Sequence, residues 1–320
     1  MSTTTLSVVI CTRDRPVELE RCVGSVLEAV RQAAGAHIQL VVVDDTGRVP
    51  APIDALRSQA RAAGVATVTY ARNRRAVGLF ASRLVGIAQA TGRIILFLDD
   101  DATIAPEYLV TLATLYDRYP SAAGIGGVDQ LDEPRSWIVR AIHRAVLVDS
   151  GRPGTLSYSG FAGSLRRWAA ERTDFTSEYL AGCNMSFRRA ALAPLGPVEW
   201  LRGYSLGEDL YVSHVARQAG ELVVSPTLRV WHHRSPMARD AMAEVARARV
   251  VNTAQLLRLR GGGGSSLRTL GLCWTVAWLV LKDVVRARQL AALPGYLRGI
   301  RDLAQSAPPA TGGVRRVGSP

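Results

Sequence analysis

Short apolar runs alternate with longer amphipathic stretches through the first part of the chain. The runs predict strands at 6–11, 38–43, 66–70, 94–98 and 122–128. Between them, apolar residues at helical spacing predict helices at 17–34, 53–63, 77–89 and 106–119. Strands that are apolar throughout are typical of a sheet covered on both faces. The regular alternation of strands and helices predicts an α/β fold with a doubly wound, mostly parallel central sheet flanked by helices.

The pattern changes beyond the last of these strands. Residues 129–176 show no clean period, and a long irregular insert in a compact domain is typically an active-site lid or a substrate loop. The sequence then predicts a helix at 207–218, strands at 222–224 and 228–231, and helices at 237–260, 267–288 and 296–305. The last three predict a C-terminal helical extension, followed by a disordered tail at 306–320 that is rich in Pro, Gly and Ala.

Acidic residues follow two of the predicted strands directly. Asp44 and Asp45 come after the second strand, and Asp99, Asp100 and Asp101 come after the fourth. A sheet interior cannot hold adjacent charges without a positive partner, and open α/β sheets bind ligands at the carboxyl ends of their strands. Side-chain alternation places Asp99 and Asp101 on one side, spaced to share a divalent cation and a nucleotide ribose. The alternative is an acidic cap before the helix that starts at Pro106.

Composition and charge narrow the class of protein. The chain has 320 residues, of which 48% are hydrophobic and 21% charged, so it is globular rather than disordered. Its net charge of +12 would suit an anionic partner. Residues 255–320 hold ten basic and two acidic side chains, so most of the excess lies in the C-terminal part and not across the sheet. We therefore expect no nucleic acid partner.

The cysteine and hydropathy patterns bear on localisation. The four cysteines are scattered, with no metal-ligand spacing, and fit a reducing compartment. The N-terminus has no signal-peptide pattern, and the longest uncharged apolar run, 269–281, is shorter than the roughly 20 residues of a spanning helix. These features predict a cytoplasmic protein, either free or in peripheral contact with the inner face of a membrane.

Five stretches, in this order and spacing, resemble the family 2 glycosyltransferases, which have the GT-A fold. The stretches are Ser7 to Thr12, Val43 to Gly47, Phe97 to Asp101, Gly182 to Arg189 and Gly207 to Leu210. The resemblance covers about residues 6–233. It implies a nucleotide-diphosphate sugar as donor, with UDP as the default nucleotide, and a hydroxyl acceptor on a saccharide, a lipid-linked molecule or a small molecule. It also implies a divalent cation, Mg²⁺ or Mn²⁺.

The resemblance assigns roles at the donor site residue by residue. Thr12 and Arg13 would cover the base, and Asp44, or less readily Asp45, would accept a hydrogen bond from the base or ribose. Asp99 and Asp101 match the family's Asp-x-Asp, Asp99 facing the ribose and Asp101 holding the metal, while a register with Asp100 on the metal stays open. Arg83 is a candidate contact for the diphosphate, and Arg74 and Arg75 could serve equally or be a solvated pair.

The resemblance also assigns the catalytic and acceptor side. Asp209 of the pair Glu208-Asp209 would be the general base of an inverting transfer, and Gly182, Cys183, Asn184 and Met185 would line the acceptor. A helix N-terminus favours the ionised carboxylate that such a base needs, although the pair could equally be an acidic cap. His232, after Trp231, takes the place of a metal-binding histidine in some members, with His233 and a purely structural histidine as the alternatives.

The predicted organisation follows from these roles. We expect a catalytic domain at 1–235, with a nucleotide-sugar-binding half at 1–128 and an acceptor-binding half at 129–235, then a helical extension at 236–305. Residues 265–290 form an apolar helix with tryptophans and basic ends, which would contact a membrane surface or a second copy of the chain. The alternative functions are a sugar-nucleotide pyrophosphorylase, whose Gly-rich loop and N-terminal lysine are missing here, and a non-catalytic nucleotide- or lipid-binding protein.

Overall fold

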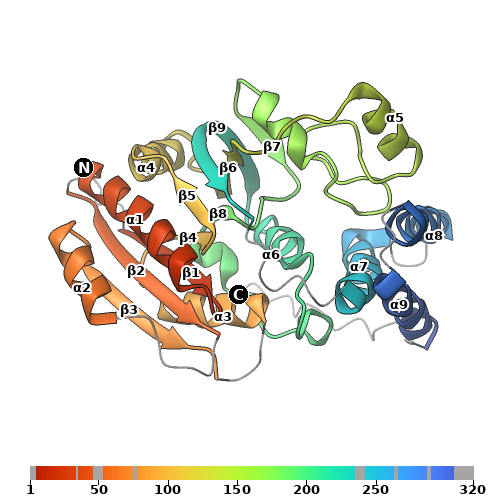
Figure 1. The fold of residues 1–320 in the computed structure, drawn as a ribbon. Helices are drawn as coiled ribbons and strands as arrows, with labels where there is room; N and C mark the ends of the chain where they lie inside the picture. Colours follow the sequence, from red (N-terminus) through yellow and green to blue (C-terminus); the bar gives the residue numbers. More distant parts are fainter. Residues whose placement is uncertain are drawn as a thin grey trace, which may run out of the picture.

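The computed structural model (Figure 1) describes residues 5–33, 35–45, 53–74, 78–234, 242–262, 266–286 and 290–305. In these ranges one sheet of nine strands has the order β3-β2-β1-β4-β8-β6-β9-β5, with β7 paired to β9. The strands are β1 Thr5–Thr12, β2 His37–Asp44, β3 Thr67–Arg72, β4 Ile94–Asp99, β5 Ala102–Ile104, β6 Ala122–Asp129, β7 Phe175–Ser177, β8 Asn184–Arg188 and β9 Glu221–His232.

The sheet is mostly parallel, which confirms the predicted fold class. β1 pairs parallel with β2 and β4, and β2 pairs parallel with β3. β8 runs antiparallel between β4 and β6, and β9 runs parallel to β6. As a result β1, β2, β3, β4, β6 and β9 all point one way, and their carboxyl ends lie along one edge of the sheet.

Helices cover both faces of the sheet. Val8 and Ile10 of β1 pack in one apolar cluster with α1 (Pro16–Gln32), α2 (Ile53–Ala62) and α4 (Tyr108–Arg118). Val9, on the opposite side of the same strand, packs in a second cluster with α3 (Leu79–Gln89) and α6 (Glu208–Ala216). Burial on both faces explains why the central strands are apolar at nearly every position.

Two strands differ from the sequence-based expectation. Residues 184–188 form β8, which the sequence analysis did not predict. Residues 221–232 form the single long strand β9, so the prediction of two separate strands there is wrong. At the expected break around Pro226, the register of β9 against β6 shifts between Val224 and Arg229, so the two predicted strands correspond to the two parts of β9 on either side of an irregularity.

The insert at 129–176 is less irregular than its sequence suggested. It contains α5 (Trp137–Ala145), the 3₁₀ helix η1 (Leu165–Ala170) and β7. The Ser136 hydroxyl caps α5 by accepting a hydrogen bond from the backbone N–H of Val139. Two further 3₁₀ turns, η2 (Arg189–Leu192) and η3 (Glu199–Leu201), precede α6.

The C-terminal helices have their own small core. They are α7 (Met242–Leu257), α8 (Ser266–Val280) and α9 (Leu293–Gln305), joined by π turns η4 (Arg258–Gly262) and η5 (Leu281–Arg286) and by η6 (Leu290–Ala292). Val250, Val276 and Tyr296 pack together in this core. Among the described residues, no helix has the length and apolarity to cross a bilayer. The predicted tail at 306–320 and Gly47 of the second motif lie outside the described residues.

Candidate active site

The predicted acidic residues meet at the carboxyl edge of the sheet. Thr12 at the end of β1 is in register with Asp44 at the end of β2, and Cys11 is in register with Asp99 at the end of β4. The chain then turns through Asp100 and Asp101 into β5, which pairs with the end of β9. This topology places residues that are far apart in sequence on one edge of the sheet.

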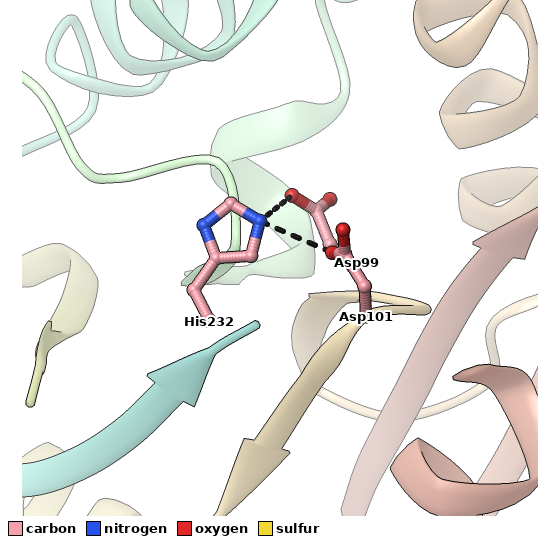
Figure 2. A group of neighbouring side chains, drawn as sticks. All are labelled: Asp99, Asp101 and His232. Atoms are coloured by element: carbon pink, nitrogen blue, oxygen red, sulfur yellow. Dashed lines mark ion pairs between the residues drawn. The ribbon is translucent and has the colours of Figure 1, made fainter. Parts of the chain in front are cut away.

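Asp99, Asp101 and His232 form a compact group at this edge (Figure 2). His232 Nε2 lies 3.1 Å from Asp101 Oδ1 and 3.9 Å from Asp99 Oδ2, and one ligand atom from each residue lies within 4.8 Å of the others. The backbone N–H of His232 donates to Asp129 Oδ1 at 3.0 Å, which fixes the end of β9. Two carboxylates and an imidazole at this spacing are a suitable ligand set for a divalent cation.

The electrostatics of this group favour a positive charge inside it. Burial alone would lower the pKa of His232, but its hydrogen bonds with Asp101 and Cys183 and the nearby charge of Asp99 raise the pKa to about 11. The two carboxylates therefore stabilise a positive charge at the His232 ring. A divalent metal ion bound there would take the place of the ring proton, so the group fits a divalent metal. His233 lies apart from it, since its Nε2 is 3.0 Å from the Thr103 hydroxyl and its side chain is exposed.

Asp100 is held differently from its two neighbours. Its carboxylate accepts hydrogen bonds from Thr12 Oγ1 at 2.8 Å and from Arg15 Nη1 at 3.0 Å. Burial raises the pKa of Asp100 to about 6, against these two hydrogen bonds. The side chains of the three aspartates therefore alternate in direction as expected. Asp99 and Asp101 lie beside His232, and Asp100 contacts Thr12 and Arg15 at the end of β1 and in the loop that follows it. Arg15 was not singled out in the sequence, although three adjacent carboxylates demand a nearby cation.

Asp44 and Asp45 are both engaged with the chain. Asp44 accepts a hydrogen bond from the Tyr70 hydroxyl, and burial together with this bond raises the pKa of Tyr70 to about 12. Asp45 accepts from Asn73 Nδ2 and from the backbone N–H of Gly78, both at 2.9 Å. Asp45 thus ties three segments of the chain together at the end of β2.

Thr12 and Arg13 differ in how they are held on the loop after β1. Thr12 is half-buried, and Arg13 is exposed. The Thr12 hydroxyl is bound to Asp100, and the Thr12 carbonyl accepts the backbone N–H of Asp45 at 2.9 Å. The loop is therefore anchored at Thr12 and presents Arg13 to solvent.

Arg83 is an internal cation that joins the sheet edge to α6. Its side chain is 2% exposed, and its Nη2 donates to Asp99 Oδ1 at 2.9 Å and to the Gly182 carbonyl at 2.8 Å. Its Nη1 donates to Glu208 Oε1. The guanidinium therefore lies between the carboxylates of Asp99 and Glu208 with almost no open surface, and the contact with the diphosphate expected for Arg83 stays a prediction.

Glu208 and Asp209 open α6, directly after Gly207 in the left-handed region at φ 81°. Burial raises the pKa of Glu208 to about 8 against the charge of Arg83, and its Oε2 has no hydrogen-bond partner among the described residues. Asp209 is half-buried and accepts the backbone N–H of Leu210 at 2.9 Å. Burial raises its pKa as well, while Arg83 opposes the shift.

Gly182 packs directly against this pair. A Cβ at Gly182 would lie 3.3 Å from Asp209 Cβ and 3.4 Å from Glu208 Oε1, tighter than most real contacts. Glycine therefore fits this close approach without displacing the side chains of Asp209 and Glu208. Gly182 and Asp209, both predicted site residues, are thus neighbours.

The rest of the predicted acceptor segment turns inward. Cys183 is buried, with a pKa raised by burial and lowered in part by its hydrogen bond with His232. Asn184 and Met185 begin β8 and are both 0% exposed, and Met185 packs in a core cluster. Their side chains therefore face the protein interior, and the acceptor role expected for this segment stays a prediction. The side-chain oxygen and nitrogen of Asn184 have no partner in the part of the chain that the structure describes.

Known proteins resemble this chain in sequence and in fold. The family model for glycosyl transferase family 2 matches residues 7–194. A glucosyl-dolichyl phosphate glucuronosyltransferase of Haloferax volcanii is 28% identical over 135 residues, which cover 42% of this chain and only 40% of that protein.

Two solved structures illustrate the shared fold. S. aureus TarS 1–349 in complex with UDP-GlcNAc matches with a TM-score of 0.57 at 14% identity, over 95% of this chain and 82% of that one. The mannosyltransferase PcManGT from Pyrobaculum calidifontis, in complex with GDP-Man and Mn²⁺, matches with a TM-score of 0.54 at 15% identity, over 93% and 87%. At these identities the likeness is one of fold.

Proposed function

Because this chain belongs to glycosyl transferase family 2, and is thus a glycosyltransferase with the GT-A fold, we propose a specific reaction for it. It transfers a sugar from a nucleotide-diphosphate donor, UDP-linked by default, to an acceptor hydroxyl, with inversion and with the help of a divalent cation. The observation that carries the proposal is the group of Asp99, Asp101 and His232 at the carboxyl ends of the parallel strands. We assign the activity to residues 1–235, with 236–305 as an extension.

Asp99, Asp101 and His232 would hold the cation. When bound, a divalent cation neutralises the charge that gathers on the departing diphosphate. His232 must release its proton to serve as a ligand, so metal binding and proton release are coupled. One imidazole beside two carboxylates makes a softer site than an all-oxygen one, which favours Mn²⁺ over Mg²⁺.

The ends of β1 and β2 would bind the nucleoside. The anchored loop at Thr12 and Arg13 is placed to cover the base, and Asp44 lies in register with Thr12, within the same edge. Arg13 is exposed, so its guanidinium plane is free to stack on a base. Asp99 lies between Arg83 and His232, and these two contacts fix its side chain. In this position its carboxylate would accept a hydrogen bond from a ribose hydroxyl.

Asp209 would act as the general base. The acceptor oxygen forms a bond to the anomeric carbon as the bond from that carbon to the diphosphate breaks, and Asp209 takes the acceptor's proton. Attack from the face opposite the leaving group inverts the anomeric centre. The start of α6 favours ionised Asp209, while burial raises its pKa toward that of a useful base. Glu208 and Arg83 position this end of α6 against the sheet edge.

The test is donor turnover by the purified full chain. A panel of UDP-, GDP- and dTDP-sugars is incubated with simple hydroxyl acceptors and with Mn²⁺, Mg²⁺ or a chelator, and released nucleoside diphosphate is measured. We expect one donor to be consumed with Mn²⁺ and not with the chelator, and NMR of the product to show inversion. Formation of a nucleoside triphosphate from pyrophosphate, or turnover that is equal with the chelator, would contradict the proposal.

A further inference from the structure

A cavity of about 440 Å³ lies well away from the residues assigned above. It lies among the end of α5, the loop that follows, η4 and the start of α8. Its lining residues are Arg144, Leu147, Asp149, Ser150, Leu156, Ser157, Tyr158, Arg260 and Arg268. Its volume is in the range of pockets that hold small ligands. Three arginines against one aspartate make its lining basic.

The three arginines are not equally engaged by the protein. Arg260 Nη2 donates to Glu178 Oε1 at 2.7 Å, and Arg144 Nη2 reaches the Gly151 carbonyl at 3.4 Å. Arg268 Nη1 is buried and has no hydrogen-bond partner among the described residues. A buried charged donor without an acceptor is costly, and an anion in the cavity would satisfy it. Guanidinium groups suit phosphate oxygens in particular.

An apolar surface adjoins the cavity. α5, which the structure describes throughout, has no buried residue, and its Trp137 is 71% and Ile138 53% exposed. On α8, Leu270 and Trp274 are also exposed, at 64% and 57%. These side chains come from two helices that lie side by side at one end of the molecule (Figure 1).

The two helices are joined at the cavity itself. Trp274 Nε1 donates to the Ala145 carbonyl at 3.0 Å, and the Thr275 hydroxyl donates to the Val146 carbonyl at 2.8 Å. A Cβ at Gly271 would lie 3.0 Å from Tyr158, a lining residue. The contact of Trp274 with Ala145 therefore brings α8 against the end of α5 that lines the basic cavity, while Trp137, Ile138 and Leu270 lie on the same two helices outside its lining.

We propose that this cavity binds the phosphate or diphosphate group of a lipid, while the apolar side chains of α5 and α8 enter the membrane interface. The basic lining and the unpartnered Arg268 supply the charge complementarity, and amphipathic helices with tryptophan are typical of interfacial contact. The inference goes beyond the proposed reaction, because it concerns lipid binding and uses no step of sugar transfer.

The test is vesicle co-sedimentation of the full chain without donor or metal. Vesicles contain phosphatidylcholine alone, with phosphatidylserine, or with phosphatidic acid at matched charge. We expect the strongest binding to phosphatidic acid, whose phosphomonoester can enter the cavity, and competition by inorganic pyrophosphate. Arg268→Gln should weaken that binding about fivefold, which corresponds to about 1 kcal/mol per basic residue. Ile138→Ser should weaken binding to all three vesicles.

Arg118→Gln is the matched control, because it removes the same charge from an exposed position on α4 and should leave binding unchanged. Circular dichroism confirms that each variant is folded. Equal binding to phosphatidic acid and phosphatidylserine, or an unaffected Arg268→Gln variant, would overturn the site. If the protein binds pyrophosphate but no vesicles, the cavity is an anion site and the assignment of a lipid as its ligand is wrong. If the protein forms a dimer that buries α5 and α8 and binds no vesicles, the proposed membrane contact is wrong. None of these outcomes bears on donor turnover.

Discussion

The edge of the sheet and the cavity beside α5 and α8 differ in the sign of their charges and in how far the protein itself pairs those charges. At the edge, consecutive aspartates each have partners from the protein: Asp99 has Arg83, Asp100 has Thr12 and Arg15, and Asp101 has His232. In the cavity, arginines from three separate segments converge, and Arg268 Nη1 has no partner in the described residues. The acidic edge is therefore balanced by partners within the fold, whereas the proposed lipid phosphate would supply the partner that Arg268 Nη1 lacks among the described residues. Substitutions at the edge should therefore cost more than substitutions in the cavity.

The largest effect is expected for Asp209→Asn. The amide cannot take a proton, so transfer should fall by about 10²–10⁴-fold, the usual contribution of a general base. Binding of the nucleotide should stay unchanged, because Asp209 would contact the acceptor. Asp117→Asn, an exposed aspartate on α4, is the matched control. A tenfold or smaller loss in steady-state transfer would remove Asp209 from the chemistry.

The pH profile tests the same residue in the unmodified protein. Asp209 acts as a base only when ionised, and burial raises its pKa above the ordinary value. Activity should therefore be lost as the pH falls through that raised pKa, with an acid limb above the usual range near 4. An acid limb at or below the ordinary carboxyl range would contradict the assignment.

Arg83→Met should have the largest effect on folding. It leaves Asp99 and buried Glu208 without their shared cation, so the free energy of unfolding should fall by about 3–5 kcal/mol. The comparison is Arg268→Met, which removes an arginine of the same size from the cavity. Urea denaturation measures both. If Arg268→Met lowers the free energy of unfolding as much as Arg83→Met does, the proposed difference between the sheet edge and the cavity is wrong.

A smaller effect separates the two neighbouring histidines. His232→Ala should weaken Mn²⁺ binding by at least about tenfold, because even outer-shell partners of a metal typically contribute 10–100-fold. His233→Ala is the matched control, since its ring contacts the Thr103 hydroxyl and stands outside the group. Titration followed by electron paramagnetic resonance measures free Mn²⁺. Equal losses in the two variants would remove His232 from the metal site.

The smallest effect is expected in the cavity. Inorganic pyrophosphate at about tenfold its dissociation constant should raise the free energy of unfolding of the wild-type chain by about 1.4 kcal/mol. This corresponds to a Tm shift of a few degrees. At the same pyrophosphate concentration the stabilisation should fall to about 0.6 kcal/mol in Arg268→Met, because fivefold weaker binding leaves the anion at only about twice its dissociation constant. The Tm of Arg268→Met without ligand should stay close to that of the wild type. An undiminished pyrophosphate shift in Arg268→Met would place the anion elsewhere.

The sequence predicted the central sheet well because its strands carry a strong local signal. β1, β2 and β4 are buried on both faces and are therefore almost entirely apolar, with Ser7 and Gln39 as buried polar exceptions that hydrogen-bond each other at 2.6 Å. β8 was missed because Asn184, Ser186 and Arg188 interrupt its apolar pattern and its position depends on antiparallel pairing with β4 and β6. β9 was predicted as two strands because Pro226 suggests a break, and the ladder between β6 and β9 shifts its register there, between Val224 and Arg229, before pairing resumes.

The site was predictable to the extent that its residues follow strands directly. Asp99 and Asp101 alternate along one segment, so their shared side follows from local geometry. The burial of Arg83 between Asp99 and Glu208 could not be predicted because it depends on tertiary packing, and its contact with the diphosphate stays a prediction. The same holds for the cavity, whose bounding contact between Trp274 and Ala145 joins distant segments.

The central claim is that Asp99, Asp101 and His232 hold a cation that binds the donor's diphosphate. The most direct measurement is calorimetric titration of UDP with and without Mn²⁺, on the wild-type chain, Asp101→Asn and Asp100→Asn. We predict that UDP binding requires Mn²⁺ in the wild type and in Asp100→Asn, and that Mn²⁺ gives no gain in Asp101→Asn. UDP binding that is indifferent to Mn²⁺ in the wild type, or an Mn²⁺ gain that survives in Asp101→Asn, would contradict the claim.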